Sequence, residues 1–304
     1  MDLLMNMQSA IAQGTLWGIM ALGVYITFRL LDIADLSCEG SFAMGGCVSS
    51  VMIIMGFNPF ITLIFATLAG MLAGFVTGLL HTKFMIPAIL SGILTMIALY
   101  SVNIHIMGQP NTSLLGEDTV FTLVMNQFGL DQTVATLLVG GVICVVVILV
   151  LYWFFGTELG CTLRATGNNE FMVRALGGNT DTSKVIGLLL SNGLIALSGA
   201  LVGQNQGYGD VKMGIGSIVI GLASIVIGEV IFGNRFNFVY VLISVVVGSV
   251  VYRMIISLVL HFGLNTDDMK LFTAIVVALA LGIPALRSKY MQKRIPASEE
   301  DSSC

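Results

Sequence analysis

Two carboxylates interrupt an otherwise apolar region near the N-terminus. The stretch ADLSCEGSFAMGG places Asp35 and Glu39 between a hydrophobic stretch at 9–28 and another that begins at Phe42. Ionisable groups in such surroundings are functional candidates by default, because removing their charge from water is costly. We expect Asp35 to cap a helix N-terminus. Glu39 lies further into the apolar sequence and is the better candidate for lining a pathway.

The composition is that of a membrane protein. Hydrophobic residues make up 56% of the chain and charged residues 10%, against roughly 45–50% and about 25% in a soluble domain. The mean hydropathy is +0.96. So few charges cannot cover the surface of a soluble protein of 304 residues, which predicts a polytopic membrane protein surrounded by lipid. The net charge of −4 argues against a nucleic-acid partner.

Cysteine and histidine spacing indicates neither a metal site nor a disulfide framework. The five cysteines include no CxxC pair, and the three histidines lie far apart in the sequence. We therefore expect no metal and no cofactor bound by this chain. Clustered histidines or paired aspartates at helical spacing, which a membrane-embedded enzyme needs, are also absent from the sequence. The N-terminus lacks the basic region of a cleaved signal peptide, so its first apolar segment is expected to remain as a span.

Nine segments are candidates for crossing the bilayer, which takes about 20 mostly apolar residues per helix. They cover roughly 9–28, 42–57, 60–80, 86–107, 133–155, 184–203, 217–232, 238–259 and 269–286. The second and seventh are short and flanked by glycine, which is typical of broken or partial helices. The prediction is an all-α bundle of about 8–10 spans in one domain, residues 1–288. The polar tail, 289–304, is expected to be disordered.

Charges near the span ends predict the orientation, because basic residues favour the cytoplasmic side. If every candidate crosses once, one side receives Arg29, Lys83, Arg164, Arg174, Lys184, Arg235, Arg287, Lys289, Lys293 and Arg294. The other side receives Asp2, Glu117, Asp118, Asp131, Asp210, Asp267 and Asp268, with Lys212 and Lys270 against the pattern. We therefore expect the N-terminus outside and the C-terminus in the cytoplasm of a bacterial cell membrane.

The opening stretch has a second, similar copy. GDVKMGIGSIVIGLAS at 209–224 matches ADLSCEGSFAMGGCVS at 34–49 with a one-residue gap, and each copy opens a short glycine-flanked segment. In the predicted orientation the copies start on opposite sides, which indicates an inverted repeat with halves at about 9–107 and 184–286. Chance similarity in a chain with 35 glycines is the alternative.

Paired interrupted segments point to a translocation site, because irregular backbone at membrane depth needs protein or water around it. The predicted path residues are Ser37, Glu39, Ser41, Gly45, Asp210, Gly216, Ser217 and Gly221. The serines have an alternative role in capping helices and filling close contacts. Close backbone approach, either between helices or around a substrate, is expected at Gly45, Gly46, Gly216 and Gly221, although Gly216 fits a turn equally well.

Three blocks of sequence resemble the permease subunits of ABC importers of the branched-chain amino acid and ribose type. They are LWGIMALGVYITFRLLDIADLSCEGSFAMGG at 16–46, GTELGCTLRATGNNEFMVRALGGNT at 156–180 and SNGLIALSGALVGQNQGYGDVKMGIGSIVIGLASIVIGEVIFG at 191–233. The details are similar to a bacterial branch that works with a substrate-binding lipoprotein and for which aromatic amino acids have been proposed as cargo. The resemblance implies a dimer of this chain or of two similar permeases. It also implies two copies of a separate ATPase, which bind ATP and Mg²⁺, and a binding protein outside. The sequence itself contains no GxxxxGK[ST] motif, so this chain cannot bind ATP by a P-loop.

The segment 156–183 is the part of the chain that the resemblance assigns to energy coupling. Within it, NNEFMVRALGG reads as a short helix capped by Asn168 or Asn169 and ended by Gly177 in a left-handed conformation. About seven residues are too few for a stable isolated helix, so its apolar side needs a partner surface. In the importers that this chain resembles, the equivalent loop docks on the ATPase. The expected contact residues are Arg164, Glu170, Phe171, Arg174 and Leu176; folding back onto the chain's own inner face is the alternative.

An ion-coupled secondary transporter is the rival interpretation. Such a protein would use a relay of ionisable side chains within the membrane, here Glu39, Glu229 and Arg253. Glu229 and Arg253 also lie near span ends, where long side chains reach the interface. Arg253 lies deeper than Glu229, and pairing inside the bundle is an equal alternative for it.

Overall fold

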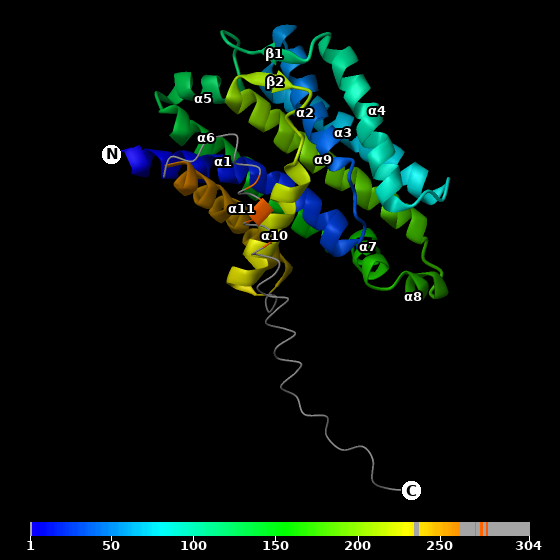
Figure 1. The fold of residues 1–304 in the computed structure, drawn as a ribbon. Coiled ribbons are helices and arrows are strands. Elements are labelled where there is room, and N and C mark those ends of the chain that lie inside the picture. Colours follow the sequence, from blue (N-terminus) through cyan, green and yellow to red (C-terminus); the bar gives the residue numbers. More distant parts are fainter. Residues whose placement is uncertain (1, 234–236, 262–270, 272–273, 276–277, 279–304) are drawn as a thin grey trace, which may run out of the picture.

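A computed structural model describes residues 2–233 and 237–261, together with 271, 274, 275 and 278. Within this part the chain forms eleven α-helices, one π-helical turn and two short strands (Figure 1). Most of the candidate span at 269–286, and the whole tail at 289–304, lie outside the described residues.

The helices follow one another with short connections, and the strands interrupt them twice. In chain order the elements are α1 (Asp2–Tyr25), η1 (Ile26–Leu30), α2 (Cys38–Ile54), α3 (Pro59–Thr82), α4 (Ala88–Met107), β1 (Asn111–Ser113), α5 (Val120–Phe128), α6 (Gln132–Phe155), α7 (Glu158–Asn168), α8 (Glu170–Ala175), α9 (Thr180–Gln206), β2 (Tyr208–Asp210), α10 (Ser217–Phe232) and α11 (Phe238–His261).

The helices agree with the predicted spans. Six are long and apolar enough to cross a membrane, namely α1 with η1, α3, α4, α6, α9 and α11. The two segments predicted to be short are the short apolar helices α2 and α10. The all-α, multi-span fold is therefore confirmed, whereas α5 and the antiparallel pair β1–β2 were not predicted.

Helices α1 and α9 lie at the centre of the bundle and are its most buried spans. Helix α3 packs along α9, and α11 packs along α1 in the corresponding way. Helix α2 lies against α9 and α3, while α10 lies against α1 and α11. In Figure 1, α2 runs toward the end of the molecule that carries the strands and α10 runs away from it. Each short helix therefore packs on one central helix and one outer helix, while the inverted repeat stays a prediction.

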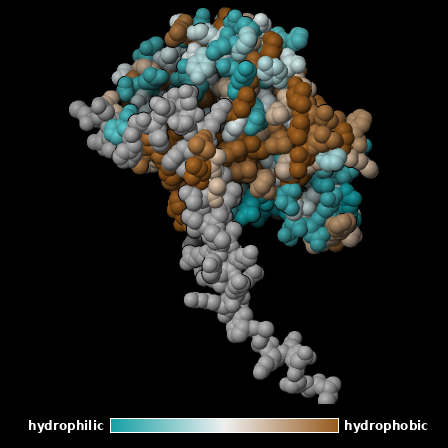
Figure 2. Space-filling model, viewed as in Figure 1, coloured by the Kyte–Doolittle hydropathy of each residue, from teal (hydrophilic) through white to brown (hydrophobic). Residues whose placement is uncertain are grey.

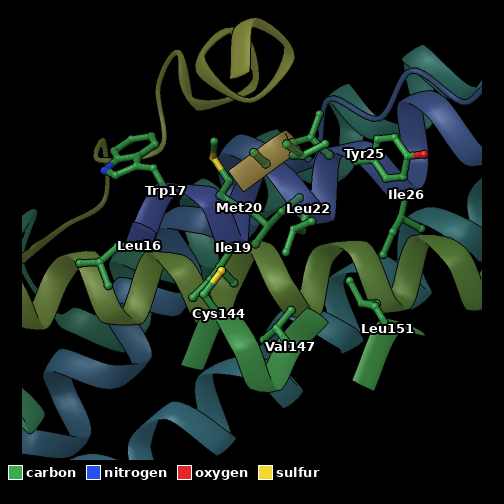
Figure 3. Packing of buried hydrophobic residues seen from close by; sticks show 14 of the residues in the cluster. Leu16, Trp17, Ile19, Met20, Leu22, Tyr25, Ile26, Cys144, Val147 and Leu151 are labelled. Atoms are coloured by element: carbon green, nitrogen blue, oxygen red, sulfur yellow. The ribbon is translucent and has the colours of Figure 1, made fainter. Parts of the chain in front are cut away.

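Side chains of α1 form the largest part of the buried core. Leu16, Ile19 and Met20 are at most 1% exposed. Figure 3 shows a row of buried side chains that begins with them and continues along α1, above Cys144 and Val147 of α6. Lipid tails are as apolar as these side chains, so close packing rather than escape from water holds such helices together.

Glycines let α2 and α9 approach to backbone contact. A Cβ at Gly45 of α2 would overlap the backbone of Ala196, and one at Gly199 of α9 would overlap the backbone of Phe42. The predicted close approach at Gly45 is therefore confirmed. Gly216 is different: it has φ +83° and nothing within 4 Å of an added Cβ, so it makes no close helix contact and fits the turn alternative.

The surface has the layered pattern of a protein in a bilayer. Figure 2 shows hydrophobic residues across the middle and right of the molecule, between a hydrophilic end near β1 and β2 and a second hydrophilic patch near α7 and α8. Exposed apolar side chains on α3, α4 and α6 include Leu72, Ile97 and Leu149. The chain is therefore a multi-pass membrane protein.

Candidate functional site: a central helix junction and the 156–183 loop

The two short helices begin at the same place. After η1, residues 31–37 lead the chain back into the bundle, and α2 starts at Cys38. The half-buried carboxylate of Glu39, in the first turn of α2, accepts a 2.9 Å hydrogen bond from the backbone N–H of Gly216, the residue that caps α10. Each helix N-terminus carries a partial positive charge, so one carboxylate stabilises both. We call Ser37, Glu39, Ser41, Gly216 and Ser217 the central junction.

Asp35 holds the start of α2 in place. Its carboxylate is 2% exposed, and Oδ1 accepts hydrogen bonds from the backbone N–H (2.8 Å) and hydroxyl (2.6 Å) of Ser37. Oδ2 accepts a 2.8 Å bond from the amide of Asn192 on α9. Asp35 therefore orders the turn before α2 and ties it to the middle of α9. The N-cap position itself is Ser37, so the expectation that Asp35 caps the helix was wrong.

Several polar atoms beside the junction lack partners. The hydroxyls of Ser41 and Ser217 and the side-chain oxygen of Asn103 are buried, and none has a hydrogen bond within the described residues. The amide of Asn103 donates to the carbonyl of Gly40, which places it beside the first turn of α2. Buried polar groups without partners are costly, at about 1–3 kcal/mol each. Their hydrogen-bonding capacity is left unused by the described residues.

Three of the eight predicted path residues lie away from the junction. Asp210 belongs to β2, opposite Asn111, and accepts a 2.6 Å hydrogen bond from the backbone N–H of Lys212. Gly45 contacts the α9 backbone, and a Cβ at Gly221 would meet Val24 of α1. The structure thus joins Glu39 to Gly216 across the two helix starts, with the serines on the adjoining first turns. The other three residues have positions in helix packing or in the strand pair.

The 156–183 loop folds into α7 and α8. Asn169 caps α8 by accepting a 3.0 Å hydrogen bond from the N–H of Met172, and Gly177 follows with φ +83°. Glu170 bonds Lys184 at 2.8 Å and Arg174 at 2.6 Å. The hydrogen bond from Lys184 is the largest of the effects that hold the pKa of Glu170 below its ordinary value. The cap at Asn169 and the left-handed Gly177 confirm both predicted ends of the helix.

Helix α8 presents apolar side chains to solvent. Phe171 is 84% exposed and Leu176 81% exposed, whereas Val173 is 5% exposed and anchors the helix. Four of the five predicted coupling residues, all but Arg164, lie on α8 or directly after it. Arg164 lies on α7, with its guanidinium carbon 4.9 Å from the centre of the Phe238 ring.

Sequence reasoning missed two side-chain pairs. Asn192 binds Asp35, as described above, and Arg29 in η1 forms two hydrogen bonds of 2.7 and 2.8 Å with Glu229 on α10. A polar residue inside an apolar span is a signal by itself, so Asn192 was detectable as a candidate. Its partner was not, because 157 positions separate it from Asp35.

The residues of the ion-coupled relay lie apart. Glu229 pairs with Arg29, Glu39 faces Gly216, and Arg253 stacks over the ring of Trp17 at 4.2 Å. No ion pair joins any two of the three relay residues within the described chain. No group of three or more His, Cys, Asp or Glu that could hold a metal ion occurs among the described residues.

Comparison with known proteins agrees with this architecture. Residues 6–289 match the family described as "Branched-chain amino acid transport system / permease component". The chain is 41% identical to the "Tyrosine transport system permease protein" of Clostridioides difficile, over 88% of both chains. It is 33% identical to an uncharacterized protein of Rickettsia prowazekii, over 90% of this chain and 95% of that one.

More distant similarities cover less sequence or only the fold. An autoinducer 2 import system permease protein of Yersinia pseudotuberculosis is 25% identical over 62% of this chain and 52% of that protein. The solved structure of PsaBC from Streptococcus pneumoniae in complex with Fab superposes with a TM-score of 0.51, at 16% identity and over 90% of both chains. With the family match spanning nearly the whole chain, this protein belongs to the permease components of branched-chain amino acid-type ABC transport systems.

Proposed function

We propose that this chain forms the translocation path of a binding-protein-dependent ABC importer for a small solute, an amino acid with an aromatic side chain. A separate cytoplasmic ATPase drives transport, and a substrate-binding lipoprotein delivers the solute outside. The path is formed by two copies of the chain in the bacterial cell membrane. The chain itself is a transport subunit and performs no chemical conversion.

The exposed apolar surface of α8 is the observation that carries the proposal. Phe171 and Leu176 are more than four-fifths exposed on a six-residue helix that ion pairs to Lys184 and Asp181 hold in place. A helix of this length does not persist alone, and exposed apolar side chains on a hydrophilic end of the molecule favour a protein partner. This supports α8 as the element that docks on the ATPase.

The central junction supports the placement of the path. Two short helices whose N-termini meet within the bundle, here of 17 and 16 residues, are typical of transporter substrate sites. Glu39 and the unpartnered hydroxyls of Ser41 and Ser217 supply the polar lining. In this conformation Ser37, Ser41 and Ser217 are fully buried, so we infer that the path is closed here and opens during the transport cycle.

The orientation and substrate proposals rest on charge and on relatives. Basic residues collect at the end that carries α7 and α8, which favours that end as cytoplasmic and the end with β1 and β2 as external. A relative with 41% identity is named a tyrosine transport system permease, which supports an aromatic amino acid as the solute.

Association with an ATPase tests the proposal. Affinity-tagged permease, extracted from its native membrane in a mild detergent, is expected to retain a protein with a P-loop motif, identified by mass spectrometry and by ATP hydrolysis in the eluate. Phe171→Asp on α8 is expected to lose this protein. The matched control is Leu115→Asp, which changes a similarly exposed apolar side chain (88%, against 84% for Phe171) at the opposite end of the molecule and should retain it.

Two outcomes would contradict the proposal. A permease that transports solute without any bound P-loop ATPase would exclude an ABC importer. An ATPase that is lost equally from the Leu115→Asp control would show that its association does not depend on the α8 end.

A further inference from the structure

A polar pocket lies between the N-terminal part of α1 and the C-terminal part of α11. Its volume is about 480 Å³, which is within the roughly 300–1,000 Å³ of small-ligand sites. It belongs neither to the central junction nor to the 156–183 loop. Its polar lining consists of Asn6, Ser9, Gln13, Arg253, Ser257 and His261.

The walls of this pocket are fixed by hydrogen bonds between the two helices. The hydroxyl of Ser257 donates to the carbonyl of Asn6 at 3.3 Å. Two turns further in, the hydroxyl of Ser249 donates to the carbonyl of Gly14 at 3.0 Å. A Cβ at Gly14 would overlap the backbone of Val250, so α1 and α11 are in close contact below the pocket. The pocket is therefore preorganised.

Arg253 is the only charged side chain among the described lining residues apart from the titratable His261. Its Nε is buried and has no hydrogen-bond acceptor within the described chain. Its guanidinium lies over Trp17, 4.2 Å from the ring centre. A cation–π contact stabilises the charge from one face, but it leaves the five in-plane N–H donors to be satisfied.

Comparison with Arg29 shows what Arg253 lacks. Arg29 donates two hydrogen bonds to Glu229 and is half exposed to solvent. No Asp or Glu lines the pocket of Arg253 within the described residues. A buried guanidinium nitrogen without an acceptor is costly, as for the Nε of Arg253. The planar fork of the guanidinium matches the two oxygens of a carboxylate or phosphate.

We propose that the pocket binds an oxyanion, held in two hydrogen bonds by Arg253 and contacted by the amides and hydroxyls of α1 and α11. The phosphodiester of a lipid headgroup and the carboxylate or phosphate of a small solute share this chemistry. The proposal is independent of the transport function, because it uses neither the junction nor α8.

Trp17 provides a direct spectroscopic reporter of binding. The chain has two tryptophans, and Trp153 is 72% exposed on α6, so Trp153→Phe leaves Trp17 as the only indole. In delipidated protein in an uncharged detergent, an anion that draws the guanidinium away from the ring is expected to change Trp17 emission saturably. Inorganic phosphate and acetate test a free anion. Phosphatidylglycerol, against diacylglycerol as the lipid without phosphate, tests a headgroup.

Variants of Arg253 test the pocket itself. Their affinities are measured by isothermal titration calorimetry, because the Trp17 signal depends on the guanidinium over the ring. Arg253→Gln removes the charge and is expected to weaken anion binding at least about tenfold, because hydrogen bonds to charged groups contribute about 1.5–3 kcal/mol. Arg253→Lys keeps the charge without the planar fork and is expected to bind with intermediate affinity, so it serves if the Gln variant fails to fold. Lys212→Gln, which removes an exposed cation elsewhere, is the control and should match the parent.

Three results would overturn the proposal. The first is the absence of a saturable change in Trp17 emission with all the anions. The second is equal affinity in the parent and in both Arg253 variants. The third is a response that is absent from the parent and arises only after Asp267→Asn and Asp268→Asn, which lie outside the described residues; that result would mean that the chain's own carboxylates occupy the pocket.

Discussion

Replacing Phe171 by aspartate should separate ATPase docking from folding of the permease. The Phe171 side chain is 84% exposed, so the permease alone gains little from it, and the substitution should change its own stability by no more than about 0.5 kcal/mol. Its exposed area is instead available to a partner. The variant is therefore expected to insert into the membrane and to elute from gel filtration like the parent.

The loss of ATPase affinity follows from the buried area. Complete burial of a phenylalanine contributes about 1.5–3 kcal/mol, and 84% of that is about 1.3–2.5 kcal/mol, or roughly 10–70-fold in Kd. A carboxylate at the same place must also be desolvated, which brings the expected loss for Phe171→Asp above about 100-fold. Phe171→Ala should show the smaller loss alone.

The assay is direct binding of the purified ATPase to immobilised permease, with ATP-driven uptake measured in parallel. Leu115→Asp is the matched control, because it places the same charge at an equally exposed apolar site far from α8. Unchanged ATPase affinity in Phe171→Asp would refute the assignment of α8. An equal loss in Leu115→Asp would show that the effect is not specific to this surface.

Three further predictions concern packing, charge and the path. Gly45→Leu should prevent formation of a monodisperse protein, because its Cβ overlaps the α9 backbone, whereas Gly141→Leu, with nothing within 4 Å, should behave normally; equal yields would disprove the contact. The pKa of Glu170 is below its ordinary 4.5, so its stabilisation of α8 is complete above that value and lost as the pH falls through the folded pKa; Glu170→Gln should abolish this change in α8 amide exchange. Ser217→Cys, in a variant whose five native cysteines have been replaced, should react with a water-soluble thiol reagent only during ATP turnover. Inertness throughout would exclude residue 217 from the path.

The sequence was most informative where structure depends on local pattern. Apolar length predicted the spans, and glycine flanks predicted that α2 and α10 are short. The end signals in NNEFMVRALGG located α8, because caps and positive-φ glycines act within a few residues.

Long-range pairings were not predictable in this way. The contact of Glu39 with Gly216 joins residues 177 positions apart, and nothing in either copy of the repeat specifies that the two N-termini meet. Strand β1 has three residues and forms only because β2 lies beside it, so it had no periodic signal of its own. The repeat alignment also placed Asp210 with the path residues, although the structure puts it in β2.

Uptake by the reconstituted complex tests the central claim most directly. Permease and its ATPase are reconstituted in proteoliposomes. The binding protein and radiolabelled tyrosine are added together, on the membrane face to which the binding protein docks. The account predicts accumulation that requires ATP, is lost in Phe171→Asp and is unaffected by imposed proton or sodium gradients. Accumulation driven by an ion gradient without ATP would contradict it.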